Sequence, residues 1–228
     1  MGESTFKVRR ASIADVAVLV ELSTSTFRDT YASAHEPAEV ERHIALNFTP
    51  AQIAAEISGP ASSMLLACVA DEPVGYAALR IGPYPDCVPG PAPIELGRLY
   101  LTKASIGKGY GSALMRACLE EQATLGCGTI WLGVWDRNAL ACAFYEKWGF
   151  RRVGTYEFLF GETPYRDVVM VRAAGPRVHT QASPAGEKPR SAPCSSGRPV
   201  RRWIASEARR TPNRMAICAP CRLSCRVV

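Results

Sequence analysis

Apolar residues along the chain alternate between strand-like runs and helix-like stripes. In the first helix-like stretch they recur every three to four positions, so that one face of a helix is apolar, at Ile13, Val16, Val20 and Phe27. Helices are predicted from Ser12 to the polar break at 30–36, at 37–46, at 49–59, from the 107–111 loop to 125, and at 138–148. Strands are predicted at 6–9, 64–70, 74–81, 94–101, 129–134, 150–160 and 167–171.

Polar residues mark where several of these elements begin or turn. Ser12 followed by Asp15 predicts a capping box at the first helix, and Thr49 before Pro50 predicts an N-cap with proline in the first turn. The segment Asp71-Glu72-Pro73 between two apolar runs predicts a hairpin. The order of strands and helices predicts an α/β fold around one mixed sheet.

Three glycines at a spacing of two, Gly107, Gly109 and Gly111, lie between the strand that ends at Leu101 and a helix. Glycine lets backbone N–H groups approach an anion, and a helix N-terminus adds unpaired donors and a positive dipole end. This pattern predicts a pyrophosphate cradle. The spacing fits neither a Walker loop, because glycine follows Lys108, nor the dinucleotide fingerprint. The alternative is a tight turn without a ligand.

A wider set of motifs gives this loop a context. The loop glycines, the segment WLGVWDRN and the run AFYEKWGF at 143–150 resemble the GNAT family of N-acetyltransferases. The resemblance spans roughly residues 5–172. It implies the GNAT acyl-CoA N-acyltransferase fold, in which helices flank a mixed central β-sheet. The fourth and fifth strands, here 94–101 and 129–134, splay apart in that fold, and the pantetheine arm of the cofactor lies in the gap.

The resemblance also implies how acetyl-CoA binds. Backbone groups of Leu99 and Leu101 would pair with the pantetheine amides, and an N–H near Leu101 would stabilise the thioester oxygen. Ile106 stands where the family has Gln or Arg, which removes a polar side chain near the phosphates but leaves the backbone donors. The full predicted set for the cofactor is Leu99, Tyr100, Leu101, Ile106, Gly107, Lys108, Gly109, Tyr110, Gly111, Ser112, Asn138, Tyr145 and Lys147.

Two side chains are expected to carry the chemistry. Tyr145 occupies the position of the family's acid and could protonate the leaving thiolate; the alternative is an ordinary helix aromatic. Glu95 matches the general base of several members; the alternatives are a surface carboxylate paired with Arg98 and a base made of water. No cysteine is placed as an acyl carrier, which favours direct transfer in a ternary complex. His35 and His43 are expected to be solvated residues at helix ends.

The acceptor is expected to be a primary amine of a small molecule, with the polyamines spermidine and spermine as first candidates. The end of the domain resembles PaiA-type spermidine/spermine acetyltransferases at Phe158, Gly161, Asp167 and Met170. Phe27 and Tyr31 are predicted to line the amine site by cation–π contact. Four acids either attract a polycation or form a solvated helix face: Asp29, Glu36, Glu39 and Glu41.

Charge divides the chain near residue 172. Residues 173–228 carry a net charge of +9, which leaves −3 of the whole-chain +6 for residues 1–172. We therefore expect an acetyltransferase domain at 1–172 and a disordered, basic Pro/Arg/Cys-rich tail at 173–228. The tail is either an extension without a role or an attachment to nucleic acid. The first is favoured, because the acetyltransferase pattern is complete without it.

Cysteine and hydropathy patterns limit the metal and membrane roles. The cysteines of the domain are expected to be buried thiols in a reducing compartment. Cys218, Cys221 and Cys225 lack a fourth ligand at suitable spacing, so no metal is expected. Neither a signal-peptide pattern nor a transmembrane-length apolar run is present. We expect a cytoplasmic protein without a membrane partner, and a homodimer stays open.

The sequence therefore predicts an acetyl-CoA-dependent N-acetyltransferase that acts on a small amine. Two alternatives stay open. One is the acetylation of a protein or peptide amine, and the other is a non-catalytic acetyl-CoA-binding sensor whose basic tail binds nucleic acid.

Overall fold

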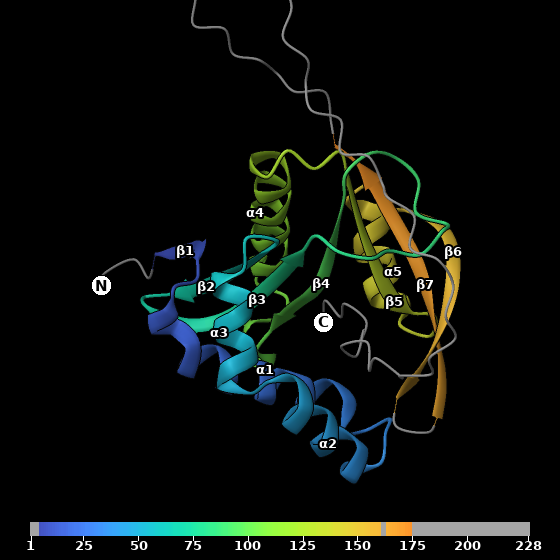
Figure 1. The fold of residues 1–228 in the computed structure, drawn as a ribbon. Coiled ribbons are helices and arrows are strands. Elements are labelled where there is room, and N and C mark those ends of the chain that lie inside the picture. Colours follow the sequence, from blue (N-terminus) through green and yellow to red (C-terminus); the bar gives the residue numbers. More distant parts are fainter. Residues whose placement is uncertain (1–4, 161–162, 175–228) are drawn as a thin grey trace, which may run out of the picture. The chain divides into compact units, whose positions relative to one another are not determined.

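One seven-stranded sheet organises the part of the chain that the structure, a computed structural model, describes, which is residues 5–160 and 163–174 (Figure 1). The strand order is β1-β2-β3-β4-β5-β7-β6, and only the pair β4–β5 is parallel. The strands are β1 (Phe6–Arg10), β2 (Ser62–Val69), β3 (Glu72–Arg80), β4 (Pro93–Leu101), β5 (Thr129–Trp135), β6 (Arg151–Phe160) and β7 (Thr163–Ala173). This arrangement confirms the predicted mixed α/β sheet, with each strand within a few residues of its predicted bounds.

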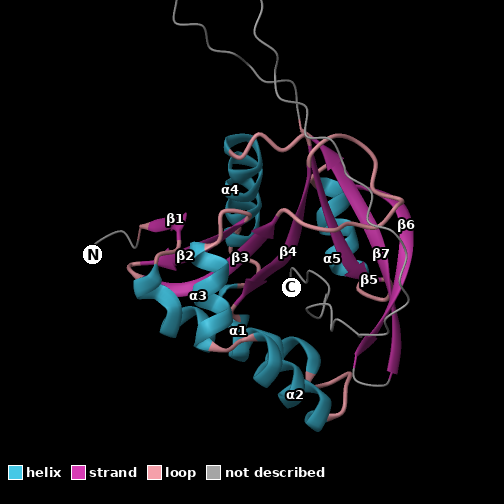
Figure 2. Ribbon diagram, viewed as in Figure 1, coloured by secondary structure: helices cyan, strands magenta, loops and turns pink. Residues whose placement is uncertain are grey.

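Helices cover both faces of the sheet (Figure 2). They are α1 (Val16–Tyr31), α2 (Pro37–Asn47), α3 (Pro50–Ser58), α4 (Tyr110–Thr124) and α5 (Ala139–Lys147). Apolar side chains of α4 and α5 pack with the central strands on one face, and those of α1 and α3 pack on the other. We call these the α4 face and the α1 face. Each predicted helix is present, again with small differences at the ends.

The two predicted N-caps are confirmed by their hydrogen bonds. Ser12 and Asp15 form the capping box of the turn that leads into α1. Arg9 donates to both oxygens of Asp15, at 2.8 and 2.6 Å, and this ion pair holds the pKa of Asp15 well below its usual range. At α3, the Thr49 hydroxyl accepts from the Gln52 N–H at 3.3 Å while the Gln52 side chain accepts from the Thr49 N–H at 3.2 Å. Local sequence therefore sets where the α1-face helices begin.

The parallel strands β4 and β5 pair only at their starts. Their register covers Pro93–Glu95 against Thr129–Trp131. Beyond it, β4 continues beside β3 as far as Leu101, and β5 continues beside β7 as far as Trp135. The two strands therefore part after Glu95 and Trp131, which confirms the predicted splay.

A β-bulge at Gly97 changes which side chains of β4 face which way. Arg98 pairs with Ala78 and Leu96 pairs with Leu79, so Gly97 is an extra residue in β4. Side chains alternate between faces in a regular strand, so the bulge shifts that alternation by one. Residues before it on the α4 face are Ile94 and Leu96, and Leu99 returns to that face after it. Glu95, Arg98 and Tyr100 consequently share the α1 face, where they line one cavity.

Several further predictions concern burial and the tail. Cys68, Cys118, Cys127 and Cys142 are buried free thiols, and Cys87 is half-buried; burial raises the pKa of the Cys68, Cys127 and Cys142 thiols. Within the described residues, no helix is long and apolar enough to cross a bilayer. The predicted tail, from residue 175 on, and its three clustered cysteines lie outside the described residues.

Candidate active site

The loop between β4 and α4 has the backbone that a phosphate cradle requires. Gly107 and Gly109 have φ angles of +78° and +83°, a left-handed conformation that glycine adopts without strain. Gly109 is the N-cap of α4, and the first backbone donors of a helix have no intrahelical partner. A Cβ added at either glycine would meet nothing within 4 Å. These glycines therefore serve backbone conformation rather than packing, and they leave open space in front of the helix N-terminus.

The residues of and beside this loop differ in how exposed they are and in what they contact. Lys108 and Ser112 are exposed and Ile106 is half-buried, while Gly111 is buried in the first turn of α4. The Tyr110 ring stacks on Phe6 of β1, with 4.5 Å between centroids, which ties the start of α4 to the sheet. Backbone N–H groups of this loop would hold a diphosphate. The isoleucine at position 106 does not remove those donors.

The splayed strands provide the second half of the expected cofactor path. Beyond Glu95 the strand β4 has no pairing with β5, so its backbone groups on that side are not used by the sheet at Leu99 and Leu101. Leu99 and Tyr100 are buried, and Leu101 is nearly so. The predicted pairing of a pantetheine arm with this edge is therefore sterically and chemically consistent with the strand geometry.

The predicted cofactor residues of α5 lie at the two ends of that helix. Asn138 is its N-cap, and its side-chain oxygen accepts from the Ala141 N–H at 3.1 Å. Lys147 is exposed in the last turn. Contact of either residue with acetyl-CoA stays a prediction.

Tyr145 lies in the core of the α4 face. Its side chain is fully buried and makes edge contacts with Phe144 and Phe150, with centroids 5.5 and 5.6 Å apart. It packs in the same cluster as Ile130 and Leu132 of β5. Two aromatic neighbours thus fix the ring of Tyr145 in the core, and its role as the acid stays a prediction.

Glu95 lies on the opposite face of the sheet, at the last residue before the strands part. It is only 6% exposed, and its Oε2 accepts from Arg80 Nε at 2.6 Å. Arg80 stands directly across from Glu95 in the β3–β4 register, which is the closest cross-strand position. The predicted alternative of a surface carboxylate paired with Arg98 is wrong, because the register brings Arg80 to Glu95 instead.

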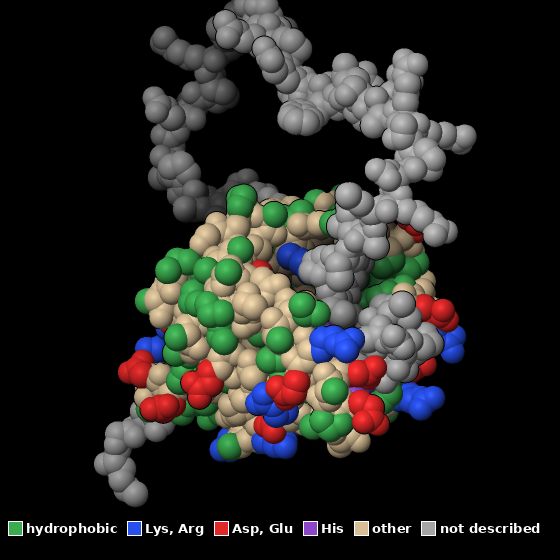
Figure 3. All heavy atoms as spheres, turned by 60° about the horizontal axis from the view of Figure 1, so that its bottom comes forward, with side chains coloured by type: hydrophobic (Ala, Val, Ile, Leu, Met, Phe, Trp, Pro, Cys, Tyr) green, Lys and Arg blue, Asp and Glu red, His purple; other side chains and the backbone are tan. Residues whose placement is uncertain are grey.

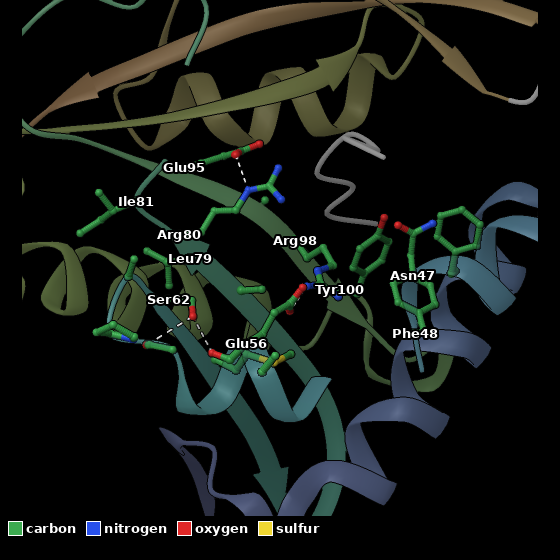
Figure 4. Close-up of a pocket in the computed structure, with 18 of the residues that line it drawn as sticks. Asn47, Phe48, Glu56, Ser62, Leu79, Arg80, Ile81, Glu95, Arg98 and Tyr100 are labelled. Atoms are coloured by element: carbon green, nitrogen blue, oxygen red, sulfur yellow. Dashed lines mark hydrogen bonds and ion pairs between the residues drawn. The ribbon is translucent and has the colours of Figure 1, made fainter. Parts of the chain in front are cut away.

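A cavity of about 390 Å³ opens on the α1 face beside Glu95 (Figure 4). Strands β2, β3 and β4 form its floor, and α2, α3 and the segment Gly59–Ala61 form its walls. The apolar part of its lining includes Phe27, Phe48, Met64, Leu79 and Ile81. Its charged lining residues, among those described, are Glu56, Arg80, Glu95 and Arg98. A cavity of this size and mixed character suits a small molecule.

Arg98 is fixed in this cavity by two contacts. Its Nη2 donates to Glu56 Oε2 of α3, and its guanidinium carbon lies 5.6 Å from the centre of the Phe48 ring. Only 15% of the side chain is exposed. Burial acts to lower the pKa of Arg98, but Glu56, together with Tyr76 and Tyr100, raises it above its ordinary value, so the group is a permanent cation.

The aromatic residues predicted to meet the amine are placed unequally. Phe27 lines the cavity, whereas Tyr31 is buried beneath it in the α1–α2 cluster and is not among the described lining residues. His43 is also a lining residue, and the prediction that it is solvated is wrong. It is 5% exposed and stacks on Phe27, with 4.5 Å between centroids.

The His43 ring is neutral near pH 7. Burial, and secondarily the charge of Arg98, lower its pKa to about 3. Its Nδ1 lies 3.2 Å from the Asn47 side-chain nitrogen, which can only donate, so Nδ1 accepts and the proton is on Nε2. His43 therefore adds no charge to the cavity.

The predicted acids around the first loop are exposed and already paired in part. Glu41 accepts from Arg28 at 2.7 and 2.9 Å, and Asp29 lies 3.0 Å from Lys103. Figure 3 shows acidic and basic side chains interleaved along the lower rim of this face rather than a continuous acidic patch. This pattern favours the alternative of a solvated helix face.

Sequence reasoning missed Glu56, Arg80 and Arg98. Arg98 is a charged residue inside the apolar strand 94–101, and Arg80 ends the apolar run 74–81. A charge in an otherwise buried strand is informative because such a group must be paired or used. That signal was available, but the partners could not be paired without the β3–β4 register and its bulge.

Comparisons with known proteins give the fold and the activity class. A PaiA N-acetyltransferase from Thermoplasma acidophilum, solved in complex with coenzyme A, superimposes with a TM-score of 0.61 at 23% identity, over 74% of this chain and 99% of that chain. An uncharacterized N-acetyltransferase of Mycobacterium bovis is 36% identical over 147 residues, which are 63% of this chain and 90% of the relative.

A third relative is named probable spermine N(1)-acetyltransferase, from Bacillus subtilis subsp. natto. It is 29% identical over 86 residues, which are 37% of this chain and 57% of that protein.

The sequence model of the acetyltransferase (GNAT) family matches residues 19–150. That match runs from α1 to the end of α5, and so includes the glycine loop, the splayed strands and Tyr145. The match covers more than half of the chain, and acetyl-CoA is the acetyl donor of this fold. The chain belongs to the GNAT family of acetyltransferases.

Proposed function

We propose that this protein transfers the acetyl group of acetyl-CoA to a primary amine of a small molecule bound in the α1-face cavity, by direct transfer in a ternary complex. The observation that carries the proposal is the position of Glu95. This residue is buried, lines the cavity and marks the point where β4 and β5 part. An amine beside Glu95 would reach the splay from the side opposite the glycine loop and α4.

In this proposal Glu95 is the general base. Bound acetyl-CoA supplies an activated thioester carbonyl. Glu95, directly or through one water, takes a proton from the acceptor ammonium and leaves a lone pair that forms the N–C bond. Arg80 orients the carboxylate through its 2.6 Å hydrogen bond. Backbone N–H groups near Leu101, at the free edge of β4, would stabilise negative charge on the carbonyl oxygen.

Tyr145 is the general acid. As the C–S bond breaks, its phenol gives a proton to the departing sulfur. The second proton of the attacking nitrogen passes to solvent as the amide forms, and Tyr145 is reprotonated from solvent once CoA has left. Burial among Phe144 and Phe150 supports this role, because a fixed phenol loses no orientation entropy during the reaction. Acid and base would thus act from opposite faces of one sheet.

A polyamine is the acceptor that the sequence favours. The relative named for spermine acetylation supports it over the 86 aligned residues, whereas the two carboxylates of the cavity, Glu56 and Glu95, are each paired with an arginine. Asp167 of the PaiA-like ending is buried in β7, with Tyr156 donating to it at 3.2 Å. Gly161 lies outside the described residues, and the Phe158 side chain is also not described.

The buried, reduced cysteines favour the cytoplasm as the site of the reaction.

Thiol release from acetyl-CoA, measured with the full chain against a panel of amines, tests the activity. We expect turnover with at least one small primary amine, and a fall of about tenfold or more in kcat for Tyr145→Phe. The matched control is Tyr84→Phe, since Tyr84 is exposed and lies outside the cavity lining. Binding of acetyl-CoA without turnover of any small amine would overturn the proposal and favour a protein acceptor or a sensor.

A further inference from the structure

The charged groups of the cavity balance one another. Two carboxylates and two guanidiniums line it, His43 is neutral, and no other Asp, Glu, Lys, Arg or His is among the described lining residues. A polycation entering this cavity would meet no net negative charge. A molecule that carries both an ammonium and a carboxylate would instead find a counter-charge at each end.

Arg80 is positioned to bind a second group besides Glu95. Its Nε is used by Glu95, and guanidinium carries further N–H donors in a fixed fork. Figure 4 shows the end of Arg80 turned away from Glu95, into the space between Arg80 and Arg98. Its side chain is 35% exposed, which keeps these outer donors accessible from the cavity.

Arg98 stands on the other side of this space and is held in place before any ligand arrives. Glu56 fixes one nitrogen, and the Phe48 ring supports the guanidinium plane at 5.6 Å. Burying an ion pair beside apolar residues contributes little net stability, because desolvation offsets the attraction. The two pairs of the cavity are part-buried, with Arg80 35% and Glu56 33% exposed, and two of them in one small cavity are better explained by recognition of a charged ligand than by folding.

We infer that the acceptor is an amine that also carries a carboxylate, of the amino-acid class, with its carboxylate bound between Arg80 and Arg98 and its amine at Glu95. The inference rests on the proposed N-acetyltransferase function and names its substrate class. Planar guanidinium groups match a carboxylate in bidentate geometry. Phe27, Met64, Leu79 and Ile81 offer an apolar wall, so an acceptor with an apolar side chain fits best. The carboxylate keeps its charge throughout the acetyl transfer.

Discrimination should come from the loss of this contact. A site built around buried donors rejects a ligand that leaves them unpaired more strongly than an apolar pocket rejects a missing methylene. The carboxamide of an amino acid keeps the shape and loses the charge, and the corresponding plain alkylamine loses the group altogether. Spermidine carries several ammonium groups and no anion. These four compounds separate the acceptor classes.

The experiment compares leucine, leucinamide, isopentylamine and spermidine in the thiol-release assay, with the full chain and saturating acetyl-CoA. kcat/KM is taken across pH, so that each amine is compared at the same unprotonated fraction. We expect leucine to exceed each of the other three by about tenfold or more. Equal or better turnover of leucinamide, isopentylamine or spermidine would overturn the inference while leaving the acetyltransferase function in place.

Variants then locate the carboxylate contact. Arg98→Met would leave Glu56 without its partner, so the double variant Arg98→Met/Glu56→Gln removes both charges and protects folding. Arg80→Met is not paired with a change at Glu95, which must stay for the reaction. We expect the preference for leucine over leucinamide to fall toward one in Arg80→Met and in the double variant. Glu56→Gln alone keeps both guanidiniums and should keep the preference.

Thermal melting of each variant accompanies the assay. A variant that lowers kcat/KM equally for leucine and leucinamide reports a structural role, and that result in both arginine variants would overturn the inference. Thiol release with none of the four amines, nor with any other small amine, would instead reject the proposed function itself.

Discussion

The two faces of the splayed sheet are built in different ways. On the α4 face, the glycine loop, the start of α4 and Tyr145 come from one stretch of chain between β4 and the end of α5. On the α1 face, the cavity gathers residues from α1, α2, α3, β2, β3 and β4. The residues of the α4 face are close in sequence, so they form a motif with fixed spacing. The residues of the α1 face come from distant segments, so each can be substituted without disturbing such a motif. In the proposed function, this contrast separates donor binding from acceptor recognition.

The largest expected effect comes from removing the proposed general base on the α1 face. Glu95→Gln keeps the shape of the side chain and its contact with Arg80 but removes the base, and general base catalysis contributes about 100-fold or more. We expect kcat to fall by about that factor while the Kd for acetyl-CoA stays unchanged, as measured by steady-state kinetics and calorimetry. Glu120→Gln, on the exposed side of α4, is the control. An unchanged kcat would assign the base to water.

The next largest effect comes from a substitution in the glycine loop, which changes the α4 face alone. Gly109→Val forces a β-branched residue into a conformation with φ near +83° and places a side chain in the open space before α4. We expect the Kd for acetyl-CoA to rise by about 30-fold or more, which corresponds to about 2 kcal/mol. Gly82→Val is matched, because Gly82 also has open space around it but no positive φ. Unchanged affinity would place the phosphates elsewhere.

The pH dependence of stability tests the α1 face separately from the α4 face. Among the described residues, the buried neutral histidine lies on the α1 face. The pKa of His43 is about 3 when folded, against 6.5 as its ordinary value. Below pH 6.5 the unfolded chain therefore takes up a proton that the folded chain does not, and stability falls as pH falls from 6.5 toward 3. At pH 5 this amounts to about 2 kcal/mol.

Urea unfolding at pH 7.5 and pH 5 measures that difference in wild type and in His43→Gln. We expect the variant to lose less stability between the two pH values, by about 2 kcal/mol. Substitution of His179, which lies in the sequence beyond the described residues, provides a histidine control. Parallel losses in wild type and His43→Gln would show that His43 is not the group responsible.

The smallest expected effect comes from destabilising α3, the helix that forms one wall of the cavity. Thr49→Ala removes the N-cap of α3, which costs about 1 kcal/mol, and α3 carries Glu56. We expect a small loss in unfolding free energy and a several-fold rise in KM for the acceptor, with no change for acetyl-CoA. Ser25→Ala, inside α1, is a control without a capping role. A rise in KM for acetyl-CoA instead would contradict the separation of the two faces.

Predictions from the sequence also differ between features set by neighbouring residues and features set by long-range packing. The strands and the caps at Ser12 and Thr49 depend on neighbours in sequence, and each was predicted and is present. The glycine loop was predicted too, but the left-handed φ angles of Gly107 and Gly109 were not. The splay was predicted from family resemblance, and the β4–β5 register confirms it.

What failed depends on long-range packing. The alternative of a pair between Glu95 and Arg98 failed because the cross-strand register places Arg80 directly opposite Glu95. His43 was expected at a solvated helix end, and it is buried because Phe27 of α1 and Phe48, the C-cap residue of α2, close over it. No local pattern carries the register of a sheet or the closing of one helix over another.

The extra residue at Gly97 also bears on how such an enzyme can be altered. Because the bulge places positions 95, 98 and 100 on one face and 94, 96 and 99 on the other, a single strand serves two independent tasks. Acceptor choice can be engineered at positions 98 and 100, while positions 94, 96 and 99 keep the hydrophobic seat of α4 intact. One glycine thus separates the side chains of β4 that face the cavity from those that hold α4.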